Sequence, residues 1–476
     1  MLVRMRANLR CYHPGPALEP LAALAEWRSA DGYSKRSVVL WRYDAARDLL
    51  VLPRGLWPLP AQHGPYRVAD ERLSHPPLPW RWAGPPLDAV QRRVATELRR
   101  LGEGLLVAPG GSGKTNIALY VLSRWGQPAL WVADTTDLAQ QALDRAAAVL
   151  RLPDGAIGTA MDGALRPGTH LTVGLRQTLA DVRDPRWLRR FGAVVYDEGD
   201  RAASDSAWRM LCRYPARYRI GATATPERAD KLHPVVGAVV GRPIVRVTMA
   251  EAVAAGRFMV PRVRIIQTGL RYRWRGSWPL LQGERAGDSR RNRMIAQHAA
   301  RLVRRGRNVL LLVQRLDHAA DMAGLLRALG IPARALTGAV PPEQRRTLLE
   351  AARKGGGLAL VATKLLDRGV DLPVMDRVLL CDPYRSAPTV EQQVYRVTRT
   401  ATEQGKTDAA IIDFWDSGKQ FERQQHDRLR LFLELGFRID GVPAGYHLPR
   451  FRLRPGVLGP PVVNGRAVRQ ACIVEG

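Results

Sequence analysis

The chain has 476 residues and a formal net charge of +29, with 46% hydrophobic and 25% charged residues. This length exceeds that of one compact domain, and the composition is that of a globular protein rather than a disordered or membrane-embedded one. No run reaches the roughly 18 apolar residues of a membrane span, and the N-terminus lacks the apolar core of a signal peptide, so we expect a cytoplasmic protein with no membrane contact. The basic excess favours a polyanionic partner, although a GC-rich coding bias toward arginine explains part of it.

The four cysteines, Cys11, Cys212, Cys381 and Cys472, lie far apart and form no C-x-x-C pair. This spacing indicates neither a zinc site nor a disulfide framework. We therefore expect all four to be small buried apolar residues.

The composition divides the chain into four parts. Residues 1–86 are rich in Pro and Trp, and their apolar runs SVVLWRY and LLVLPRGLW predict strands joined by a turn. Residues 87–248 alternate helical stretches with apolar runs such as GLLVA and FGAVVYDE. Residues 249–416 begin with a linker that extends to about residue 288 and then resume the alternation with runs such as NVLLLV and DRVLLCD, which predicts two tandem α/β domains with parallel sheets. Residues 417–476 begin with a basic helical segment and end in a Pro-, Gly- and Arg-rich tail in which we expect little order.

A glycine-rich segment, APGGSGKT at residues 108–115, lies between the strand-like GLLVA and the helix-like NIALYVL. This context predicts a phosphate-binding loop, in which the glycines let backbone N–H groups face phosphates at a helix N-terminus. Lys114 would reach the β- and γ-phosphates of ATP, and the Thr115 hydroxyl would ligate Mg²⁺. The other nucleotide-binding residues of the loop are Gly111, Ser112 and Gly113. A plain glycine turn with an incidental lysine is the alternative.

Two acidic residues follow the apolar run FGAVVY. Asp197 would hold Mg²⁺ through water, and Glu198 would orient and deprotonate the water that attacks the γ-phosphate. Two acids after an apolar run are commonly a solvated strand end, but the glycine loop upstream favours the catalytic interpretation. Asp200 completes a D-E-x-D box.

The motifs over residues 87–415, in this order, resemble those of superfamily 2 helicases, and more narrowly the branch with the XPB-type and phage UvsW-type DNA helicases. GATATP, VATKLLDRGVDLP and QQVYRVTR resemble three further helicase motifs, and VPRVRII, TGAVPPEQRR and VLPRGLW resemble other segments of that branch. The resemblance implies two RecA-like domains, a small β-rich N-terminal domain that would bind DNA, and a basic C-terminal tail.

The resemblance also assigns roles to residues around the nucleotide. Gln91 looks like the glutamine that reads adenine. Thr223 and Thr225 would hydrogen-bond to Asp200 and, with Gln392, couple hydrolysis to domain movement. From the second domain, Gly369 and Asp371 would approach the ribose and phosphates. Arg396 and Arg399, three residues apart on one helical face, would act as arginine fingers on the γ-phosphate; a merely solvated basic helix face is the alternative.

Nucleic-acid contacts carried over by motif position are Thr135, which follows an Asp134 that replaces the usual Pro, and Arg176, Gln177, Thr337, Gly338 and Thr363. One feature belongs to this sequence alone, the alternation Arg271-Tyr272-Arg273-Trp274. On a strand it would place both aromatic rings on one face, where they would stack on bases or wedge a fork. A half-buried edge strand with solvated arginines is the alternative.

The function implied by the resemblance is a monomeric, nucleic-acid-stimulated ATPase that uses ATP and Mg²⁺ to unwind, branch-migrate or remodel duplex or branched DNA. An RNA helicase shares nearly every motif, although the GATATP form and the XPB-like segments speak against it. A motor subunit of a larger DNA-processing complex is the third interpretation, in which a partner would supply any endonuclease.

Overall fold

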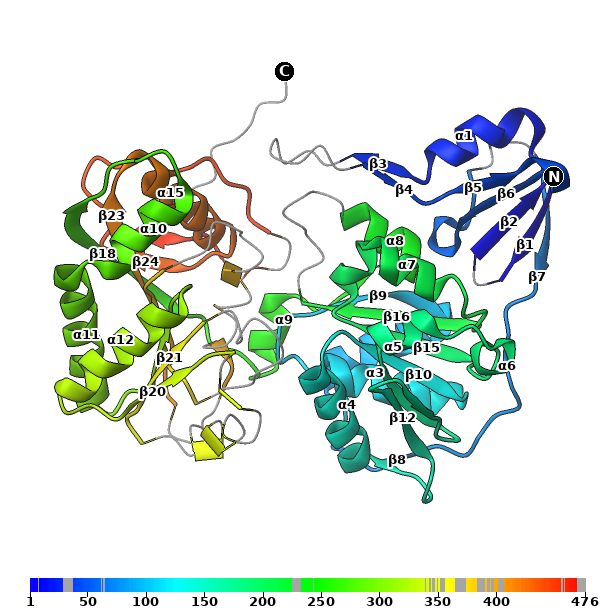
Figure 1. Ribbon diagram of the computed structural model, residues 1–476, viewed down its shortest axis with the longest axis horizontal. Helices are drawn as coiled ribbons and strands as arrows, with labels where there is room; N and C mark the ends of the chain where they lie inside the picture. The colour runs from blue at the N-terminus through cyan, green and yellow to red at the C-terminus, as the bar shows by residue number, and fades with distance from the viewer. Residues whose placement is uncertain are drawn as a thin grey trace. The chain divides into compact units, whose positions relative to one another are not determined.

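The structure is a computed structural model that describes the whole chain except residues 7, 29–36, 61, 63–64, 225–232, 243, 339, 342–343, 345–346, 349, 352–355, 364–373, 383–389, 392–393, 395–397, 401–405, 455–456, 458 and 469–476. The chain folds into two compact units, Met1–Val247 and Thr248–Gly476 (Figure 1). A helix with the length and hydropathy of a membrane span is absent from the described residues.

The first unit opens with a five-stranded sheet in the order β5-β6-β2-β1-β7. The elements of this part are β1 (Leu2–Met5), β2 (Asn8–Tyr12), α1 (Leu18–Ala23), β3 (Glu26–Arg28), β4 (Ser37–Val39), β5 (Arg42–Asp44), β6 (Leu49–Pro53) and β7 (Arg67–Asp70). Along β1 and β2 every second residue is buried, namely Val3, Met5, Leu9 and Cys11. This period of two is typical of a sheet with one covered face. The two apolar runs that predicted strands form β4, β5 and β6.

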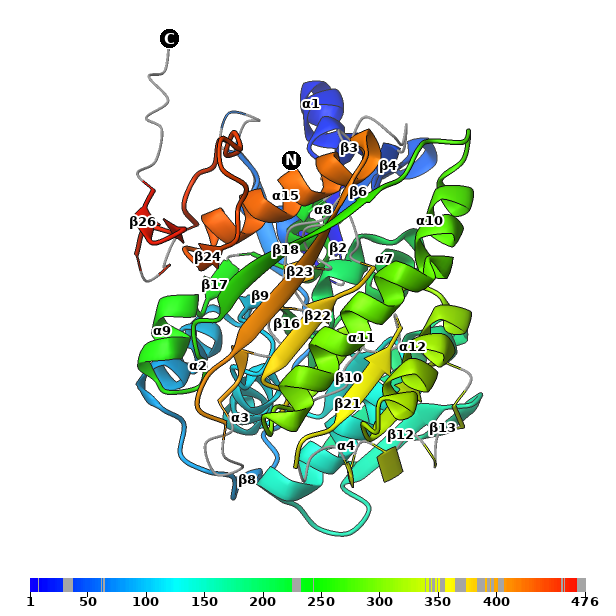
Figure 2. The same cartoon turned by 90° about the vertical axis from the view of Figure 1, so that its left-hand side faces the viewer.

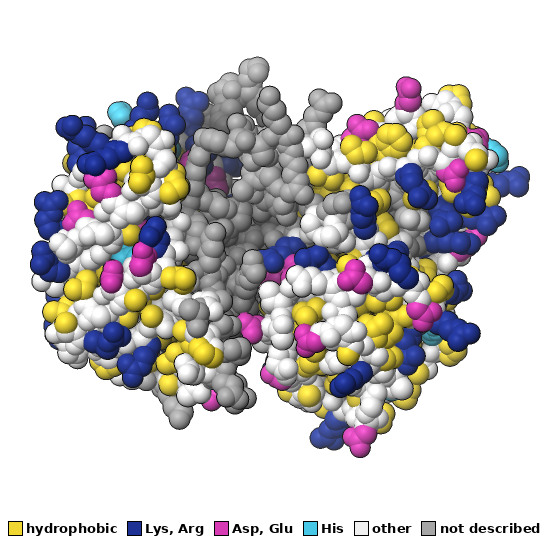
Figure 3. All heavy atoms as spheres, in the orientation of Figure 1, with side chains coloured by type: hydrophobic (Ala, Val, Ile, Leu, Met, Phe, Trp, Pro, Cys, Tyr) yellow, Lys and Arg dark blue, Asp and Glu magenta, His cyan; other side chains and the backbone are white. Residues whose placement is uncertain are grey.

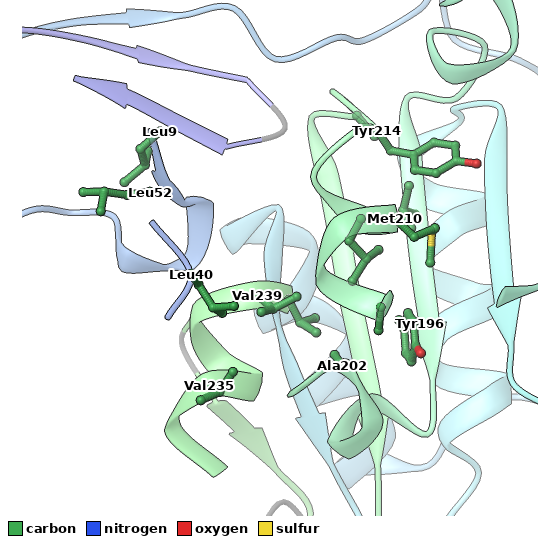
Figure 4. Packing of buried hydrophobic residues seen from close by; sticks show 14 of the residues in the cluster. Leu9, Leu40, Leu52, Tyr196, Ala202, Met210, Tyr214, Val235 and Val239 are labelled. Atoms are coloured by element: carbon green, nitrogen blue, oxygen red, sulfur yellow. The ribbon is translucent and has the colours of Figure 1, made fainter. Parts of the chain in front are cut away.

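A buried turn fixes this small sheet to the rest of the first unit. β6 runs into the short helix η3 (Arg54–Leu56), which packs on α8 (His233–Val240). The Arg54 side chain is 1% exposed, pairs with Glu103 at 2.9 Å, and donates to the carbonyl oxygen of Ala216 at 2.5 Å. The apolar residues of this interface lie in one cluster, shown in Figure 4 for Leu9, Leu40 and Leu52 and for Val235 and Val239 of α8. A shared core and a buried ion pair therefore hold the two parts together.

We expect Gly55→Ala to destabilise this interface by about 1–3 kcal/mol. A Cβ at Gly55 would overlap the carbonyl oxygen of Gly237 and lie 2.7 Å from that of Ala238, and both atoms are backbone that can yield only if α8 moves. Urea unfolding would measure the loss. The control is Gly283→Ala in α10 (Trp278–Gly287), where nothing lies within 4 Å of the new methyl group. Equal unfolding free energies for the two variants would contradict the assigned packing.

The larger sheet of the first unit has eight strands in the order β13-β12-β14-β10-β15-β16-β9-β17, all parallel except β13. They are β9 (Glu103–Val107), β10 (Ala129–Ala133), β12 (Ile157–Met161), β13 (Ala164–Arg166), β14 (Leu171–Leu175), β15 (Ala193–Asp197), β16 (Tyr218–Thr223) and β17 (Ile244–Arg246). Helices α2 (Ala89–Leu101), α3 (Lys114–Trp125), α4 (Thr136–Val149), α5 (Arg176–Asp181), α6 (Pro185–Leu188), α7 (Asp205–Leu211) and α8 flank them, and β8 (Arg81–Trp82) pairs with β11 (Leu150–Arg151). Every residue of β9 and β10 is buried, as expected for a parallel sheet covered on both faces.

The second unit contains a nine-stranded sheet in the order β20-β21-β19-β22-β23-β18-β24-β25-β26, parallel except for β26. The strands are β18 (Arg262–Arg271), β19 (Val309–Leu312), β20 (Ala333–Leu336), β21 (Ala359–Ala362), β22 (Arg377–Leu380), β23 (Ala410–Ser417), β24 (Arg438–Asp440), β25 (Val462–Val463) and β26 (Arg466–Ala467); the helices are α9 (Met249–Ala254), α10, α11 (Ser289–Arg304), α12 (Leu316–Ala328) and α15 (Lys419–Glu434). Helices α11 and α12 cover one face of the sheet (Figure 2). Along β19, Leu310 and Leu312 enter one core cluster and Val309 and Leu311 the other, so both faces are buried.

Two expectations for the second unit are wrong. The stretch expected to be a linker contains β18, which lies inside the sheet between β23 and β24. The described part of the C-terminal segment is not a loose tail, because β24 pairs with β18 and the Asn464 side chain accepts hydrogen bonds from the backbone of Gly441 and Val442. Without β24, one side of β18 would expose unpaired backbone groups, and composition alone does not reveal such a distant strand partner.

The cysteines follow the expectation in part. Cys11 and Cys381 are buried, whereas Cys212 is partly exposed and Cys472 lies outside the described residues. Burial raises the pKa of the Cys11 thiol to about 12, so this group stays an uncharged part of the core at neutral pH.

Candidate functional site

The glycine-rich loop lies where β9 ends at Val107. Within it, Gly111 and Gly113 have φ values of 99° and 88°. Residues with a side chain rarely adopt this left-handed region, so the turn requires glycine at both positions. Helix α3 starts directly afterwards at Lys114, and the N–H groups of its first turn have no partner within the helix. Such a helix start is a common anion site.

Lys114 folds back over this loop. Its Nζ donates to the carbonyl oxygens of Ala108 at 3.0 Å and Pro109 at 3.4 Å. Ser112 is 1% exposed, and its hydroxyl donates to the carbonyl oxygen of Pro109 at 2.7 Å, so this side chain braces the loop. The turn therefore presents one ammonium group and several backbone donors, a combination that fits a polyphosphate.

Gln91 supports the loop from α2. It is 3% exposed, and its Nε2 donates to the carbonyl oxygen of Ser112 at 2.9 Å. Its backbone N–H donates to Asp88 Oδ1 at 2.8 Å, and its Oε1 accepts from the Asp88 N–H at 3.3 Å, which forms a capping box at the start of α2. Both ends of the amide thus bind protein groups, and the adenine contact stays a prediction.

Asp197 and Glu198 lie at the end of a strand, at the same edge of this sheet. Asp197 ends β15 and lies opposite Ala222 of β16. The next residue of β16, Thr223, lies opposite Val107, the last residue of β9. Because neighbouring strands are about 4.8 Å apart, Asp197 lies two strands, roughly 10 Å, along the edge from the strand that enters the glycine loop. Glu198 has a φ of 51°, and its N–H donates to Asp197 Oδ1 at 3.0 Å. Both acids are partly exposed and therefore accessible to a metal ion and to water.

Thr223 ends the strand between these two groups. It is fully buried, and its carbonyl oxygen accepts from the Ala108 N–H at 3.1 Å, which joins β16 to the glycine loop. Asp200 lies in the short helix η5 (Gly199–Ala203), but its side chain and the whole of Thr225 lie outside the described residues. The hydrogen bonds expected between these threonines and Asp200 therefore stay a prediction.

The nucleotide residues expected from the second unit are mostly outside the described part of the chain, namely Gly369, Asp371, Gln392 and Arg396. Arg399 is described, and it forms an isolated antiparallel bridge with Phe258 directly after the helical Thr398. The expectation that Arg399 continues a helical face is therefore wrong, because pairing with Phe258 holds its backbone in an extended conformation.

In the first unit, the candidate nucleic-acid residues follow the neighbouring strands β10 and β14. Thr135 caps α4, with its hydroxyl accepting from the Leu138 N–H at 3.3 Å, and Gln177 is exposed. Arg176 begins α5, but its Nε lies 2.7 Å from Oδ1 of Asp134. The residues share one edge of the sheet, and Arg176 is held by a carboxylate that the sequence motif did not predict.

In the second unit, Thr337 and Gly338 follow β20, and Thr363 follows β21. These strands pair with Leu336 opposite Ala362, and the Thr363 N–H donates to the carbonyl oxygen of Leu336 at 3.4 Å. The structure therefore brings the three candidates together at adjacent strand ends. Thr337 and Thr363 are only 8% and 7% exposed, whereas Gly338 is exposed.

The alternating arginine and aromatic segment departs from the first of its two expectations. β18 ends at Arg271, and Tyr272 is 4% exposed, with its hydroxyl donating to Asp288 Oδ2 at 3.1 Å and its ring edge-on to Phe421. Trp274, by contrast, is 47% exposed. The shared aromatic face is wrong because the strand stops before Tyr272 and this ring packs into the core. The half-buried alternative agrees better with the structure: among the described residues Arg271 pairs only with Ser417 of β23, β24 pairs only with Arg262–Arg264, and the arginines of the segment are exposed.

Two family models match the chain. Residues 86–228, which hold the glycine loop and both acids, match the type III restriction enzyme res subunit, and residues 292–401 match the helicase conserved C-terminal domain. The chain belongs to helicase superfamily 2. A putative DNA 3'-5' helicase Rad25 of Halobacterium salinarum is 29% identical over 282 residues, which cover 57% of this chain and 45% of that relative. A probable helicase D10 of Escherichia phage T5 is 23% identical over 333 residues, covering 69% and 71%.

The fold of this superfamily 2 chain agrees with that of a solved structure. Dbp5 of S. cerevisiae, in a structure with RNA and ADP BeF3, matches with a TM-score of 0.53 at 15% identity and covers 71% of this chain and 86% of that one. At this identity the likeness concerns the fold, and it confirms the predicted pair of α/β units. The chain spans less than half, 45%, of the length of the Rad25 relative.

Proposed function

We propose that this superfamily 2 chain is an ATP- and Mg²⁺-dependent DNA helicase or translocase whose ATP hydrolysis is stimulated by nucleic acid. The observation that carries the proposal is the arrangement of Lys114, Asp197 and Glu198 along the C-terminal edge of one parallel sheet. Ligands of open α/β sheets bind at this edge. The basic net charge of +29 supports a nucleic-acid partner.

The described residues divide the chemistry of the site among them. Bound ATP supplies the phosphoanhydride bond whose hydrolysis drives movement. The N–H groups at the start of α3 and the Lys114 ammonium would bind its phosphates. The Thr115 hydroxyl would ligate Mg²⁺, and Asp197 would hold the ion through water. Glu198 accepts the proton of the attacking water. The assignment of Gly369, Asp371, Arg396 and Arg399 of the second unit to the nucleotide stays a prediction.

A single assay separates DNA from RNA as the partner. ATP hydrolysis by the purified chain is measured with single-stranded, duplex and branched DNA and with RNA, at one fixed salt concentration because phosphate contacts are screened by salt. We expect the largest stimulation with DNA. Stimulation by RNA alone would replace the proposal with an RNA helicase. Activity that is absent from a monomer on size-exclusion chromatography, and present only with a partner, would indicate a motor subunit.

The N-terminal sheet offers an accessory surface for nucleic acid. One row of residues crosses four neighbouring strands of this sheet. Its members, each directly opposite the next, are Arg4, Arg10, Val51 and Arg42. The face that they share is the one opposite the buried core residues of β1 and β2. Tyr12 lies on the same face, with the Arg4 guanidinium 5.2 Å from its ring centroid. Arginines beside an aromatic ring suit a phosphate backbone and an unpaired base.

The exposed ring of Trp274 supports a second contact surface. Arg271, which ends β18, and Arg273, which follows it, are also exposed. They lie at the C-terminal end of the strand, the edge of the sheet that also holds Thr337 and Thr363. On the face drawn in Figure 3, Lys and Arg side chains are spread over both units, so charge alone does not locate the path of the strand. The exposed aromatic ring is therefore the more specific indication.

We expect Trp274→Ala to weaken binding of single-stranded DNA roughly tenfold, because stacking of one base on an aromatic ring contributes about 1–3 kcal/mol. Fluorescence anisotropy with a labelled oligonucleotide would measure the change. Trp274→Phe should restore most of the affinity, and Leu280→Ala, which removes another exposed apolar side chain (62% exposed), should have no effect. Wild-type affinity in Trp274→Ala would exclude this ring from the interface.

A further inference from the structure

Asp134 lies at the centre of a polar network in the first unit. Its side chain is 3% exposed. Oδ1 accepts hydrogen bonds from Arg176 Nε at 2.7 Å and from the Tyr196 hydroxyl at 3.3 Å, and Oδ2 accepts from Arg201 Nη1 at 3.3 Å. Arg176 Nη1 also donates to Ser206 Oγ at 2.9 Å. One buried carboxylate thus joins side chains that come from the ends of β14 and β15 and from η5.

The two arginines of this network are suited to an anion. Their side chains are 22% exposed for Arg176 and 36% exposed for Arg201, and among the described side chains both form their ion pair with the same carboxylate, Asp134. Guanidinium groups bind phosphate oxygens through paired N–H donors. Thr135, the residue directly after Asp134, lies at the same sheet edge, so a phosphate of a bound strand that reaches Arg176 would meet the Asp134 carboxylate as a competitor.

Arg201 connects this network to the candidate catalytic base. It lies three residues after Glu198, and its backbone N–H donates to the carbonyl oxygen of Glu198 at 2.9 Å. Glu198 has a left-handed backbone, a conformation that only its surroundings can maintain. A shift of Arg201 is therefore expected to change the direction of the Glu198 side chain.

We propose that Asp134 is a positioning residue that couples nucleic-acid binding at Arg176 to the placement of Glu198; this inference rests on the proposed function. A phosphate that draws Arg176 away from Asp134 leaves the carboxylate bonded only to Arg201 and Tyr196. The stronger bond to Arg201 then shifts η5, the short helix in which Arg201 lies. The same carboxylate competes with nucleic acid for Arg176. Asp134 thus lowers the affinity for nucleic acid and increases the stimulation of ATP hydrolysis by bound nucleic acid. This couples the nucleic-acid site at Arg176 to the catalytic site at Glu198.

Asp134→Asn tests the coupling, because it preserves the size of the side chain and removes its charge. We expect the stimulation of ATP hydrolysis by saturating oligothymidylate to fall about tenfold. Binding of labelled oligothymidylate, measured by anisotropy, should be equal or up to roughly tenfold tighter, since Arg176 loses one charge-assisted hydrogen bond to the protein. A residue that only maintains the fold would instead weaken binding and lower the unfolding temperature.

Two further variants keep the test decisive. Asp137→Asn removes the same charge from an exposed side chain in the first turn of α4 and should change neither quantity. Arg201→Gln should lose stimulation without any gain in affinity. Full stimulation in Asp134→Asn or Arg201→Gln would overturn the inference, as would weaker DNA binding by Asp134→Asn. A wild-type ATPase that no nucleic acid stimulates would contradict the proposed function itself, whereas equal stimulation of wild type and Asp134→Asn contradicts the coupling alone.

Discussion

Replacing Lys114 by alanine is expected to lower ATP turnover about a hundredfold or more and to weaken nucleotide binding. Lys114 carries the only cationic side chain of the described glycine loop, residues 108–115. Its ammonium group donates hydrogen bonds to the carbonyl oxygens of Ala108 and Pro109. Removal of a single preorganised charge from a site of phosphoryl transfer typically costs two to three orders of magnitude in rate. Steady-state ATPase assays would measure turnover, and a fluorescent ATP analogue would measure binding.

The Arg396→Ala variant provides the informative contrast to this result. An arginine finger acts on charge that develops in the transition state, so its loss should reduce turnover while nucleotide affinity stays near that of the parent. Lys419→Ala, which removes an exposed lysine at the start of α15, should leave both quantities unchanged. Parent-like turnover in Arg396→Ala would refute the finger assignment, and parent-like nucleotide binding in Lys114→Ala would refute the phosphate assignment.

Glu198→Gln is expected to reduce turnover by roughly two to four orders of magnitude while ATP still binds, because a positioned general base contributes about that factor. The amide keeps the size of the side chain but accepts no proton from the attacking water. Single-turnover hydrolysis and equilibrium binding, measured on the same preparation, would separate the two effects.

The control for this variant is Glu19→Gln, an identical change at an exposed position of α1 in the N-terminal part. It should leave both hydrolysis and binding unaltered. A Glu198→Gln protein that hydrolyses ATP at the parental rate would remove Glu198 from the catalytic role, and the base would then have to be sought among the other acids of the same sheet edge. Loss of ATP binding in this variant would instead indicate that Glu198 supports the nucleotide pocket.

Several features of the fold could be predicted from the sequence because they depend on neighbouring residues. A strand buried on both faces is apolar at every position, so GLLVA and PALWVA were recognisable as β9 and β10. The glycine loop is similarly local, since Gly111 and Gly113 adopt a backbone conformation that other residues avoid. Alternation of such strands with helices implies parallel strands, and this places the groups that follow β9 and β15 at one edge of the sheet.

Other features were decided only by the tertiary structure, because their partners lie far away in the sequence. Arg54 reads as a surface arginine until Glu103 and the carbonyl oxygen of Ala216 surround it. In the sequence, Tyr272 and Trp274 are equivalent positions of one alternating pattern. In the structure, Tyr272 is buried against Phe421 and hydrogen-bonded to Asp288, whereas Trp274 is exposed.

The sequence by itself determined the class of fold, the glycine loop and the two acids at the end of β15, since each is encoded by a few consecutive residues. Asp134 could be noted only as a departure from the family, and its role emerged when folding brought Arg176 and Arg201 to one carboxylate. The β24 pairing with β18 likewise exists only once the chain has folded. A buried charge needs a charged or hydrogen-bonding partner, and a strand edge needs a pairing strand. Both partners come from distant parts of the sequence, so only the three-dimensional packing decides which residues they are.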